Sequence, residues 1–252
     1  DYNTQINNEK AEQVLILDYI PSQVKYIQII KPDLKIALQK NQTGWLLQEP
    51  FQDLADNIKI EELLKTLTTE KQISVIKKPE FEFKEEDLKE FGLDHPIIIF
   101  NLKNEMGHSK KISVGSIKNF EGNSYLRINS ENKIILASPI WHSKSQDDII
   151  NYREKKLYRG DLAKILKLRI KSLKDEFELI HIGDKWQEAN AALSLDQDKV
   201  RDLLKKISEV TINQYIFEGE PSISFIKEKG VDSSSINFKR VKHKFKHNFI
   251  HC

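Results

Sequence analysis

Cysteine is nearly absent from this sequence of 252 residues, since the only one, Cys252, is the last residue. A single cysteine excludes an intrachain disulfide framework and any zinc or iron–sulfur site built from several cysteines. It leaves the redox compartment open, because an envelope protein without disulfides would look the same. The sequence also lacks an apolar run of about 18 residues, so we predict no transmembrane helix within it. It begins at Asp1 and not at methionine, which leaves room for a signal or a membrane anchor before it.

The sequence has no large excess of either charge, because it contains 40 lysines and arginines and 38 aspartates and glutamates. The net charge of +2 gives no electrostatic argument for nucleic acid or a membrane surface as a partner. The sequence contains none of the glycine-rich nucleotide motifs, the HExxH metal motif, the GxSxG nucleophile motif or a CxxC pair. We therefore predict no cofactor and no catalytic residue of the common motif-marked enzymes.

A pattern in the first half of the chain returns in the second half. Six apolar residues recur 141 positions later, as the pairs Val24/Ile165, Ile27/Leu168, Ile29/Ile170, Ile36/Phe177, Leu38/Leu179 and Trp45/Trp186. The set Ile60, Leu63, Leu64, Leu67 recurs 140 positions later, and Gly92, Leu93, Asp94 recurs 138 positions later. The offset shrinks only between predicted elements, as loop deletions would produce. Because each repeat far exceeds a solenoid unit of about 20 to 50 residues, the sequence predicts two duplicated, domain-sized units.

The first repeat begins with three short strands, VKYIQII, KIALQK and WLLQEP, in which apolar and polar residues alternate. Asp56 or Asn57 then caps a helix whose apolar residues follow at i, i+3, i+4 and i+7. QISVIKK predicts a strand, and EEDLKEFG predicts a short helix that ends at Gly92. Four more strands follow up to Trp141, and a helix from Ser145 to Leu157 forms the hinge between the repeats.

The second repeat carries the matching strands, a helix from about Asp196 to Val210, the strand INQYIFEG and the short helix FIKEKG. At the offset of 138 its last residue aligns with Val114, so the strands of Asn123 to Trp141 have no counterpart; this repeat is either smaller or truncated. We predict an α+β fold of two tandem related units, each an antiparallel sheet packed with one long amphipathic helix and one short helix. The predicted boundaries are 1–20 for an N-terminal tether, 21–157 for the first unit and 158–252 for the second.

Two tryptophans occupy equivalent positions in the repeats. Trp45 and Trp186 could form aromatic platforms for a ligand, or they could be core residues whose N–H groups are satisfied at the edge of the core. We favour the core role, because the packing that the two repeats share explains why both retain the residue.

The segment EFGLDHP could present Asp94 and His95 as an acid–base pair. Its second occurrence, KGVDSSS, keeps the aspartate and loses the histidine. We favour a structural role, in which the glycine ends a helix and the aspartate binds nearby backbone N–H groups. The predicted structural signature of the repeats comprises Trp45, Leu64, Gly92, Asp94, Trp186, Leu204, Gly230 and Asp232.

Three histidines in the last ten residues give the one candidate metal site. His243, His247 and His251 are four residues apart, so on a helix they would form a stripe able to hold Zn²⁺ or Ni²⁺. The same segment alternates as a strand, and a strand separates residues four apart by about 13 Å. That spacing is too long for one ion, and we favour an edge strand protected by lysines over a metal site or a nucleic-acid surface.

The order of several short motifs resembles one bacterial family. GWLLQEP, ADNIKIEELLKTL, GLDHP, VGS, YLR and REKKL follow one another before the pattern repeats. In this order they resemble the family called domain of unknown function 4340, over about Val24 to Asn237. The resemblance implies an envelope protein with one N-terminal membrane anchor and an extracytoplasmic repeat region, encoded beside ABC-transporter components of the gliding-motility type. It implies no catalytic residue.

We therefore expect a non-enzymatic extracytoplasmic accessory or scaffold protein, anchored in the membrane in its full length and working with an ABC-type transporter. Its partners would be membrane proteins, with no nucleic acid, and its location the outer face of the bacterial cytoplasmic membrane. The alternative is an envelope ligand-binding module for a polymer or a small molecule in a cleft between the two units. A third hypothesis is a metal-dependent or hydrolytic enzyme that uses the C-terminal histidines.

Overall fold

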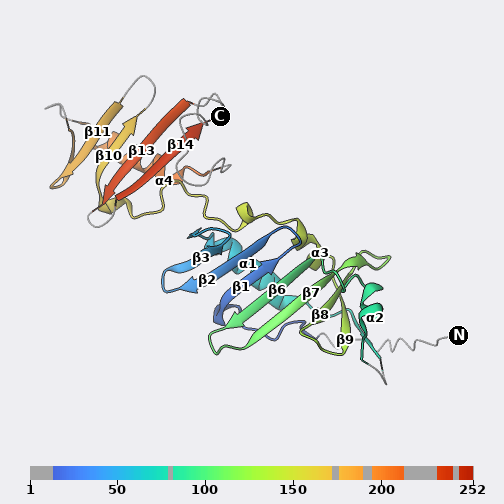
Figure 1. Ribbon diagram of the computed structural model, residues 1–252. Helices are drawn as coiled ribbons and strands as arrows, with labels where there is room; N and C mark the ends of the chain where they lie inside the picture. Colours follow the sequence, from blue (N-terminus) through green and yellow to red (C-terminus); the bar gives the residue numbers. More distant parts are fainter. Residues whose placement is uncertain are drawn as a thin grey trace. The chain divides into compact units, whose positions relative to one another are not determined.

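The computed structural model describes residues 14–78, 82–171, 176–189, 195–212, 232–240 and 244–251, the last two ranges by their backbone pairing alone (Figure 1). The chain divides into two compact units, of which unit 1 ends at Glu154 and unit 2 begins at Lys155. Both combine helices with antiparallel sheets, so the predicted α+β class is confirmed. No helix in the described ranges is both long and apolar enough to span a membrane.

Unit 1 is built on a nine-stranded sheet with the order β4-β3-β2-β1-β6-β7-β8-β9-β5. All pairs of neighbouring strands are antiparallel. The strands are β1 Val24–Ile30, β2 Lys35–Asn41, β3 Gly44–Glu49, β4 Asp53–Leu54, β5 Ser74–Lys77, β6 Ile98–Asn104, β7 Ser109–Lys118, β8 Ser124–Ile128 and β9 Lys133–Ala137. The predicted strands of this part of the chain are thereby confirmed.

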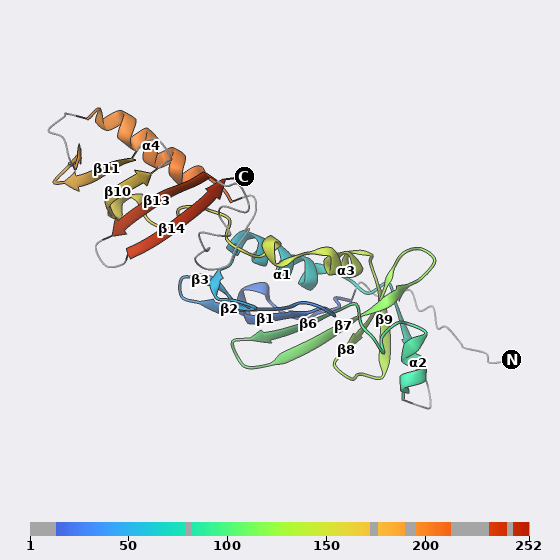
Figure 2. The same cartoon turned by 45° about the horizontal axis from the view of Figure 1, so that its top comes forward.

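The long helix of unit 1, α1 (Asn57–Thr69), lies on one face of this sheet, together with the short helix α3 (Ile140–Ser143) (Figure 2). Asp56 caps α1, because its carboxylate accepts the N–H groups of Ile58 and Lys59 at 3.0 and 3.1 Å. The predicted apolar face is buried in the core of the unit; it comprises Ile60, Leu63, Leu64 and Leu67. A second short helix, α2 (Glu85–Lys89), precedes Gly92.

Part of the segment predicted as a tether packs into unit 1. Ile16 and Leu17 are buried in its core. Leu15 forms an isolated antiparallel bridge with Lys71, which follows α1. Burial of apolar side chains therefore fixes this segment, and unit 1 begins before residue 21.

The helix predicted from Ser145 to Leu157 is wrong. This segment contains only the 3₁₀ turns Lys144–Gln146 and Ile149–Asn151, with an extended residue, Asp147, between them. After the second turn the chain runs along the edge of the sheet. There Arg153 forms an isolated antiparallel bridge with Ala55, and Glu154 N–H donates to Leu54 O at 2.9 Å. Backbone pairing with the edge of the sheet therefore replaces the backbone hydrogen bonds that a helix would have made.

Unit 2 contains a five-stranded antiparallel sheet with the order β12-β11-β10-β13-β14. Its strands are β10 Ile165–Lys171, β11 Glu176–Ile182, β12 Lys185–Glu188, β13 Asp232–Arg240 and β14 Lys244–His251. The helix α4 (Gln197–Glu209) buries Val200, Leu204 and Ile207 and is capped by Asp196. The predicted short helix FIKEKG, with Gly230, and almost all of the strand INQYIFEG lie outside the described residues.

Candidate functional site

A hollow in unit 1 is formed where the β6–β7 hairpin meets the segment that precedes β1. The hairpin turn is closed by three bonds: Asn104 N–H donates to His108 O at 3.0 Å, Gly107 N–H to Asn104 O at 3.0 Å, and His108 N–H to Asn104 Oδ1 at 2.9 Å. Gly107 has a φ of +85°, a conformation that glycine adopts without strain. The run Asn-Glu-Met-Gly-His therefore makes a defined turn between two strands.

Two further hydrogen bonds connect the segment before β1 to this turn. Tyr19 Oη donates to His108 O at 2.9 Å, and Glu105 N–H donates to Gln23 O at 2.9 Å. The ammonium group of Lys110 lies 5.4 Å from the centre of the Tyr19 ring, within the range of a cation–π contact. Burial raises the pKa of the Tyr19 phenol, so this group stays protonated at neutral pH and keeps its donor.

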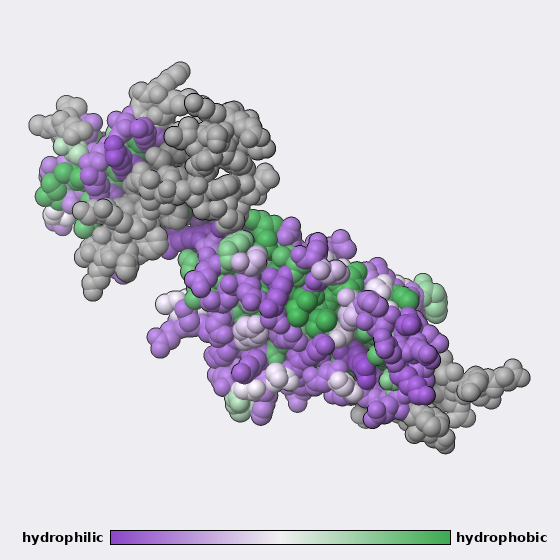
Figure 3. Space-filling model, in the orientation of Figure 1, coloured by the Kyte–Doolittle hydropathy of each residue, from purple (hydrophilic) through white to green (hydrophobic). Residues whose placement is uncertain are grey.

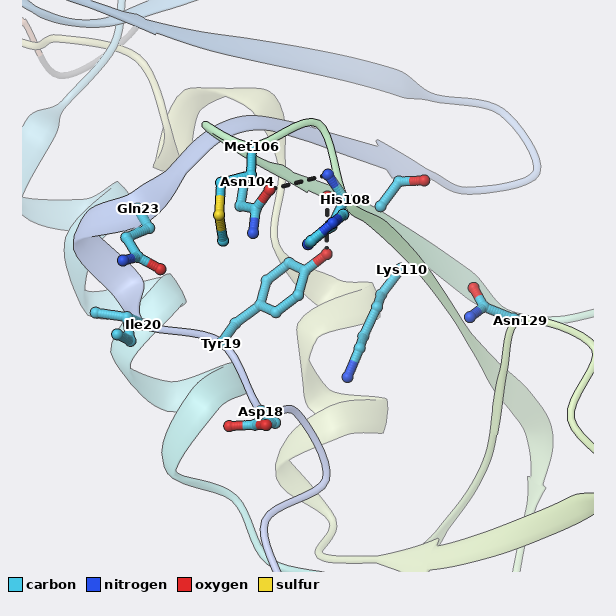
Figure 4. Close-up of a pocket in the computed structure, with 10 residues that line it drawn as sticks. Asp18, Tyr19, Ile20, Gln23, Asn104, Met106, His108, Lys110 and Asn129 are labelled. Carbon is cyan, nitrogen blue, oxygen red and sulfur yellow. Dashed lines mark hydrogen bonds between the residues drawn. The ribbon is translucent and has the colours of Figure 1, made fainter.

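Between these elements lies a cavity of about 440 Å³ (Figure 4). It is lined by Asp18, Tyr19, Ile20, Gln23, Asn104, Met106, His108, Ser109, Lys110 and Asn129. None of these residues belongs to the predicted signature, because they come from three segments far apart in the sequence. The one local signal was the polar turn Asn-Glu-Met-Gly-His, and only the fold adds the other two walls.

The predicted signature residue Trp45 is buried in unit 1 and bonded at both of its N–H groups. Its backbone N–H donates to Asn57 Oδ1 at 2.7 Å, and its indole N–H donates to Glu61 Oε1 at 3.0 Å. Lys40 Nζ lies 2.7 Å from the same carboxylate oxygen and 5.4 Å from the centre of the indole ring. Burial raises the pKa of Glu61, but the hydrogen bonds from Lys40 and Trp45 outweigh it, and the pKa falls below its ordinary value.

Changing Glu61 to glutamine should make the protein less stable at pH 7 by roughly 1 kcal/mol, because the carboxylate charge that Lys40 contacts is lost. The folded-state pKa of Glu61 is lowered, so its contribution is present above the ordinary pKa and is lost as the pH falls through the lower folded value. The stability difference between the parent and Glu61→Gln should thus shrink between about pH 5 and pH 3. Urea unfolding midpoints across this range would measure it, and a constant difference would contradict the assignment.

In unit 2 the buried Trp186 has a different polar neighbourhood. Its backbone N–H donates to Gln197 Oε1 at 2.8 Å, which matches the bond from Trp45 to Asn57. The ring of His181 stacks on the indole at 4.8 Å with an interplanar angle of 16°, where unit 1 has the ammonium of Lys40. Neither tryptophan presents an exposed face of the kind that an aromatic platform needs, since both are buried.

The segment of Gly92, Asp94 and His95 packs against β7 near its C-terminal end, at Ser116. Gly92 has a φ of +64°, and Ser116 N–H donates to Gly92 O at 3.0 Å. Asp94 Oδ2 lies 2.9 Å from Nδ1 of His95, and this hydrogen bond lowers the pKa of Asp94. The His95 side chain is 89% exposed, outside any described cavity. Asp94 and His95 therefore form a hydrogen-bonded pair, and this pair lies at the surface.

The C-terminal histidines are only partly within the described residues. His247 and His251 lie in β14, and His243 lies outside the described ranges. The strand assignment of residues 244–251 agrees with the alternating pattern. Among the residues whose side chains are described, no group of three histidine, cysteine, aspartate or glutamate side chains is placed to hold a metal ion.

A second surface feature is the tip of the β7–β8 hairpin. Phe120 is 98% exposed there, whereas hydrophilic residues cover most of the face of unit 1 that Figure 3 shows. Asn119 Oδ1 accepts the N–H groups of Glu121 and Asn123 at 3.1 and 2.8 Å, and Asn123 Nδ2 donates to Glu121 Oε2 at 3.0 Å. The polar side chains of the loop thus bind one another and leave the phenyl ring in solvent.

A family model described as Domain of unknown function (DUF4340) matches residues 45–233. No curated protein and no solved structure matches the chain. The match covers residues of both units.

Proposed function

This chain belongs to the DUF4340 family, and from that premise we propose that it is a non-enzymatic accessory or scaffold protein of the bacterial envelope. In its full length it is anchored to the cytoplasmic membrane, lies on the extracytoplasmic side and works with an ABC-type transporter. The order of the motifs supports this setting, and the polar residues that cap α1 or bond to the two tryptophans support a structural role. Asp56, Asn57 and Gln197 bind backbone N–H groups at the ends of helices and strands.

We further propose that units 1 and 2 are copies of one ancestral unit. The bridge Leu15–Lys71 in unit 1 corresponds to Lys156–Thr211 in unit 2, at offsets of 141 and 140. The flanking bonds correspond at the same offsets: Ile16 N–H to Glu70 O matches Leu157 N–H to Val210 O, and Gln72 N–H to Val14 O matches Ile212 N–H to Lys155 O. These equivalences support repeats that begin near residues 14 and 155, earlier than the predicted 21 and 158.

The strands and long helices correspond in the same way. Strands β1 and β2 have the lengths of β10 and β11 at the offset of 141, and α1 has the length of α4 at the offset of 140. The pairing of β1 with β6 and that of β10 with β13 are both interrupted after the first residue of the first strand, at Val24 and at Ile165. An irregularity shared at equivalent positions supports common descent more strongly than the lengths alone.

The observation that carries the scaffold proposal is the exposed ring of Phe120. Burying such a side chain in a partner contributes about 1.5–3 kcal/mol, and a tip already held by internal hydrogen bonds loses little conformational entropy on binding. Ile117, three residues earlier in the chain, is also exposed. A single aromatic side chain on a projecting tip fits an apolar pocket of a protein partner.

We expect a photoreactive phenylalanine analogue at position 120 of the full-length protein to cross-link to a transporter subunit in native membranes. The matched control is the same analogue at Ile58 on α1, which is 71% exposed and lies away from the hairpin tip. Mass spectrometry would identify the products, and Phe120→Ala should reduce recovery of the subunit in pull-downs several-fold. If position 120 yields no transporter subunit, or if both positions give the same products, the proposal is wrong.

A further inference from the structure

We propose that the cavity between Tyr19 and the β6–β7 hairpin binds a neutral, polyhydroxylated small molecule, that is, a saccharide. This goes beyond the scaffold role, because it concerns a site in unit 1 that the scaffold proposal does not use. The cavity volume of about 440 Å³ is within the range of about 300–1,000 Å³ that ligand pockets occupy.

Two asparagines of the lining keep their amide N–H groups available. Asn104 Oδ1 accepts the N–H of His108 at 2.9 Å, and Asn129 Oδ1 accepts the N–H of Lys111 at 2.9 Å. Because a backbone N–H needs an acceptor, each bond fixes which end of the amide is the oxygen. No described residue accepts a hydrogen bond from either NH₂ group, so both are left as donors, and Figure 4 shows the one of Asn104 turned toward the cavity.

Two further polar groups of the lining form no hydrogen bond and no ion pair with the described residues. The half-buried Gln23 side chain makes no hydrogen bond with them, although its backbone is bonded to the hairpin turn. Lys110 contacts the Tyr19 ring and forms no ion pair with a described carboxylate. A half-buried amide can both donate and accept, so the lining offers the mixed hydrogen bonding that hydroxyl groups require.

The charges of the lining favour a neutral ligand over an ion. Lys110 contributes one positive charge and Asp18 one negative charge. The Lys110 ammonium would attract an anion and the Asp18 carboxylate would repel it, whereas a cation would be repelled by Lys110 and attracted by Asp18. Asp18 is exposed at the cavity and supplies an acceptor for a hydroxyl group.

An apolar wall completes the site. Met106 and Ile20 are 64% and 57% exposed and both line the cavity. In Figure 4 the Tyr19 ring lies in the middle of the lining, with Gln23 and Met106 to its left and Lys110 to its right. A sugar ring has an apolar face of C–H groups and a rim of hydroxyl groups, which match this combination. The bonds from Tyr19 Oη to His108 and from Glu105 to Gln23 hold the walls in place before binding.

Saturation-transfer NMR and calorimetry on the full chain would test the site with four probes: glucose, N-acetylglucosamine, cellobiose and chitobiose. We expect at least one to bind with a dissociation constant on the order of 1 mM. Gln23→Leu should weaken this binding about fivefold, as for one lost neutral hydrogen bond, and should fold, because the Gln23 side chain bonds to no described residue. The matched control is Gln52→Leu, the same chemical change at an exposed position outside the cavity, which should leave binding unchanged.

Three results would overturn the proposal. One is that none of the four sugars shows saturation transfer from the protein or a binding signal in calorimetry. Another is equal binding by the parent and Gln23→Leu. The third is stronger binding of inorganic phosphate or acetate at the same residues, since this would make the cavity an anion site. Lys110→Met separates the last case, because it should abolish anion binding and weaken sugar binding only several-fold.

Discussion

Replacing Leu64 by alanine is expected to lower the free energy of unfolding by about 2 to 5 kcal/mol. Leu64 lies in the middle of the buried face of α1 and is among the fully buried side chains of unit 1. The loss combines the transfer of the removed methyl and methylene groups to water with the cavity that remains in a closely packed core. Urea unfolding followed by circular dichroism would measure it.

Two further variants sharpen this test. Leu204→Ala at the equivalent position of α4 should cost an amount in the same range, because Leu204 is buried in the core of unit 2. Ile58→Ala on the exposed side of α1 should change stability by less than about 0.5 kcal/mol. A Leu64→Ala protein as stable as the parent would refute the placement of α1 on the sheet.

Replacing Gly92 by alanine is expected to cost about 2 to 5 kcal/mol as well, for two reasons that add. The φ of +64° is strained for any residue with a Cβ atom, by about 1–2 kcal/mol. A Cβ atom at this position would also lie 2.7 Å from the backbone nitrogens of Ser116 and Ile117. Because these atoms belong to β7, the clash can be relieved only by moving the strand, which adds about 1–3 kcal/mol.

Gly122 is the matched control for this prediction. Its φ of +85° imposes comparable backbone strain, but nothing lies within 4 Å of a Cβ atom built on it. Gly122→Ala should therefore cost only the strain of about 1–2 kcal/mol. Thermal unfolding of both variants would isolate the contribution of the close contact with β7. Equal losses would show that the contact does not constrain Gly92.

The contact between the Gly92 segment and β7 could not be predicted from the short motifs alone. The sequence marks GLDHP and VGS as separate motifs, and the first as the end of a helix. In the fold they touch: Gly115 of VGS lies so close to Phe91 that a Cβ atom on it would meet the Phe91 carbonyl oxygen at 2.0 Å. Ser116, the last residue of VGS, is bonded to Gly92. Each glycine is required by the backbone of residues next to the other glycine, which no local pattern can indicate.

The sequence by itself determined the parts of this protein that depend on local periodicity and capping. The alternating strands, the apolar faces of α1 and α4 and a cap of α1 at Asp56 or Asn57 follow from side-chain spacing along one element. The offsets between the matching residues of the two halves could also be read directly, because they depend only on the order of the residues.

Only the tertiary structure decided the features that join distant segments. The segment after Ser145 avoids a helix because Arg153 and Glu154 pair with the edge of the sheet. The cavity exists because the antiparallel pairing of β1 with β6 brings Gln23 beside the hairpin turn after Asn104. Phe120 is exposed because the polar groups of its loop bind one another. Contacts between residues some eighty or more positions apart carry no periodic signal, so pairing and burial fixed the cavity, whereas the surface at Phe120 depends on hydrogen bonds within its own loop.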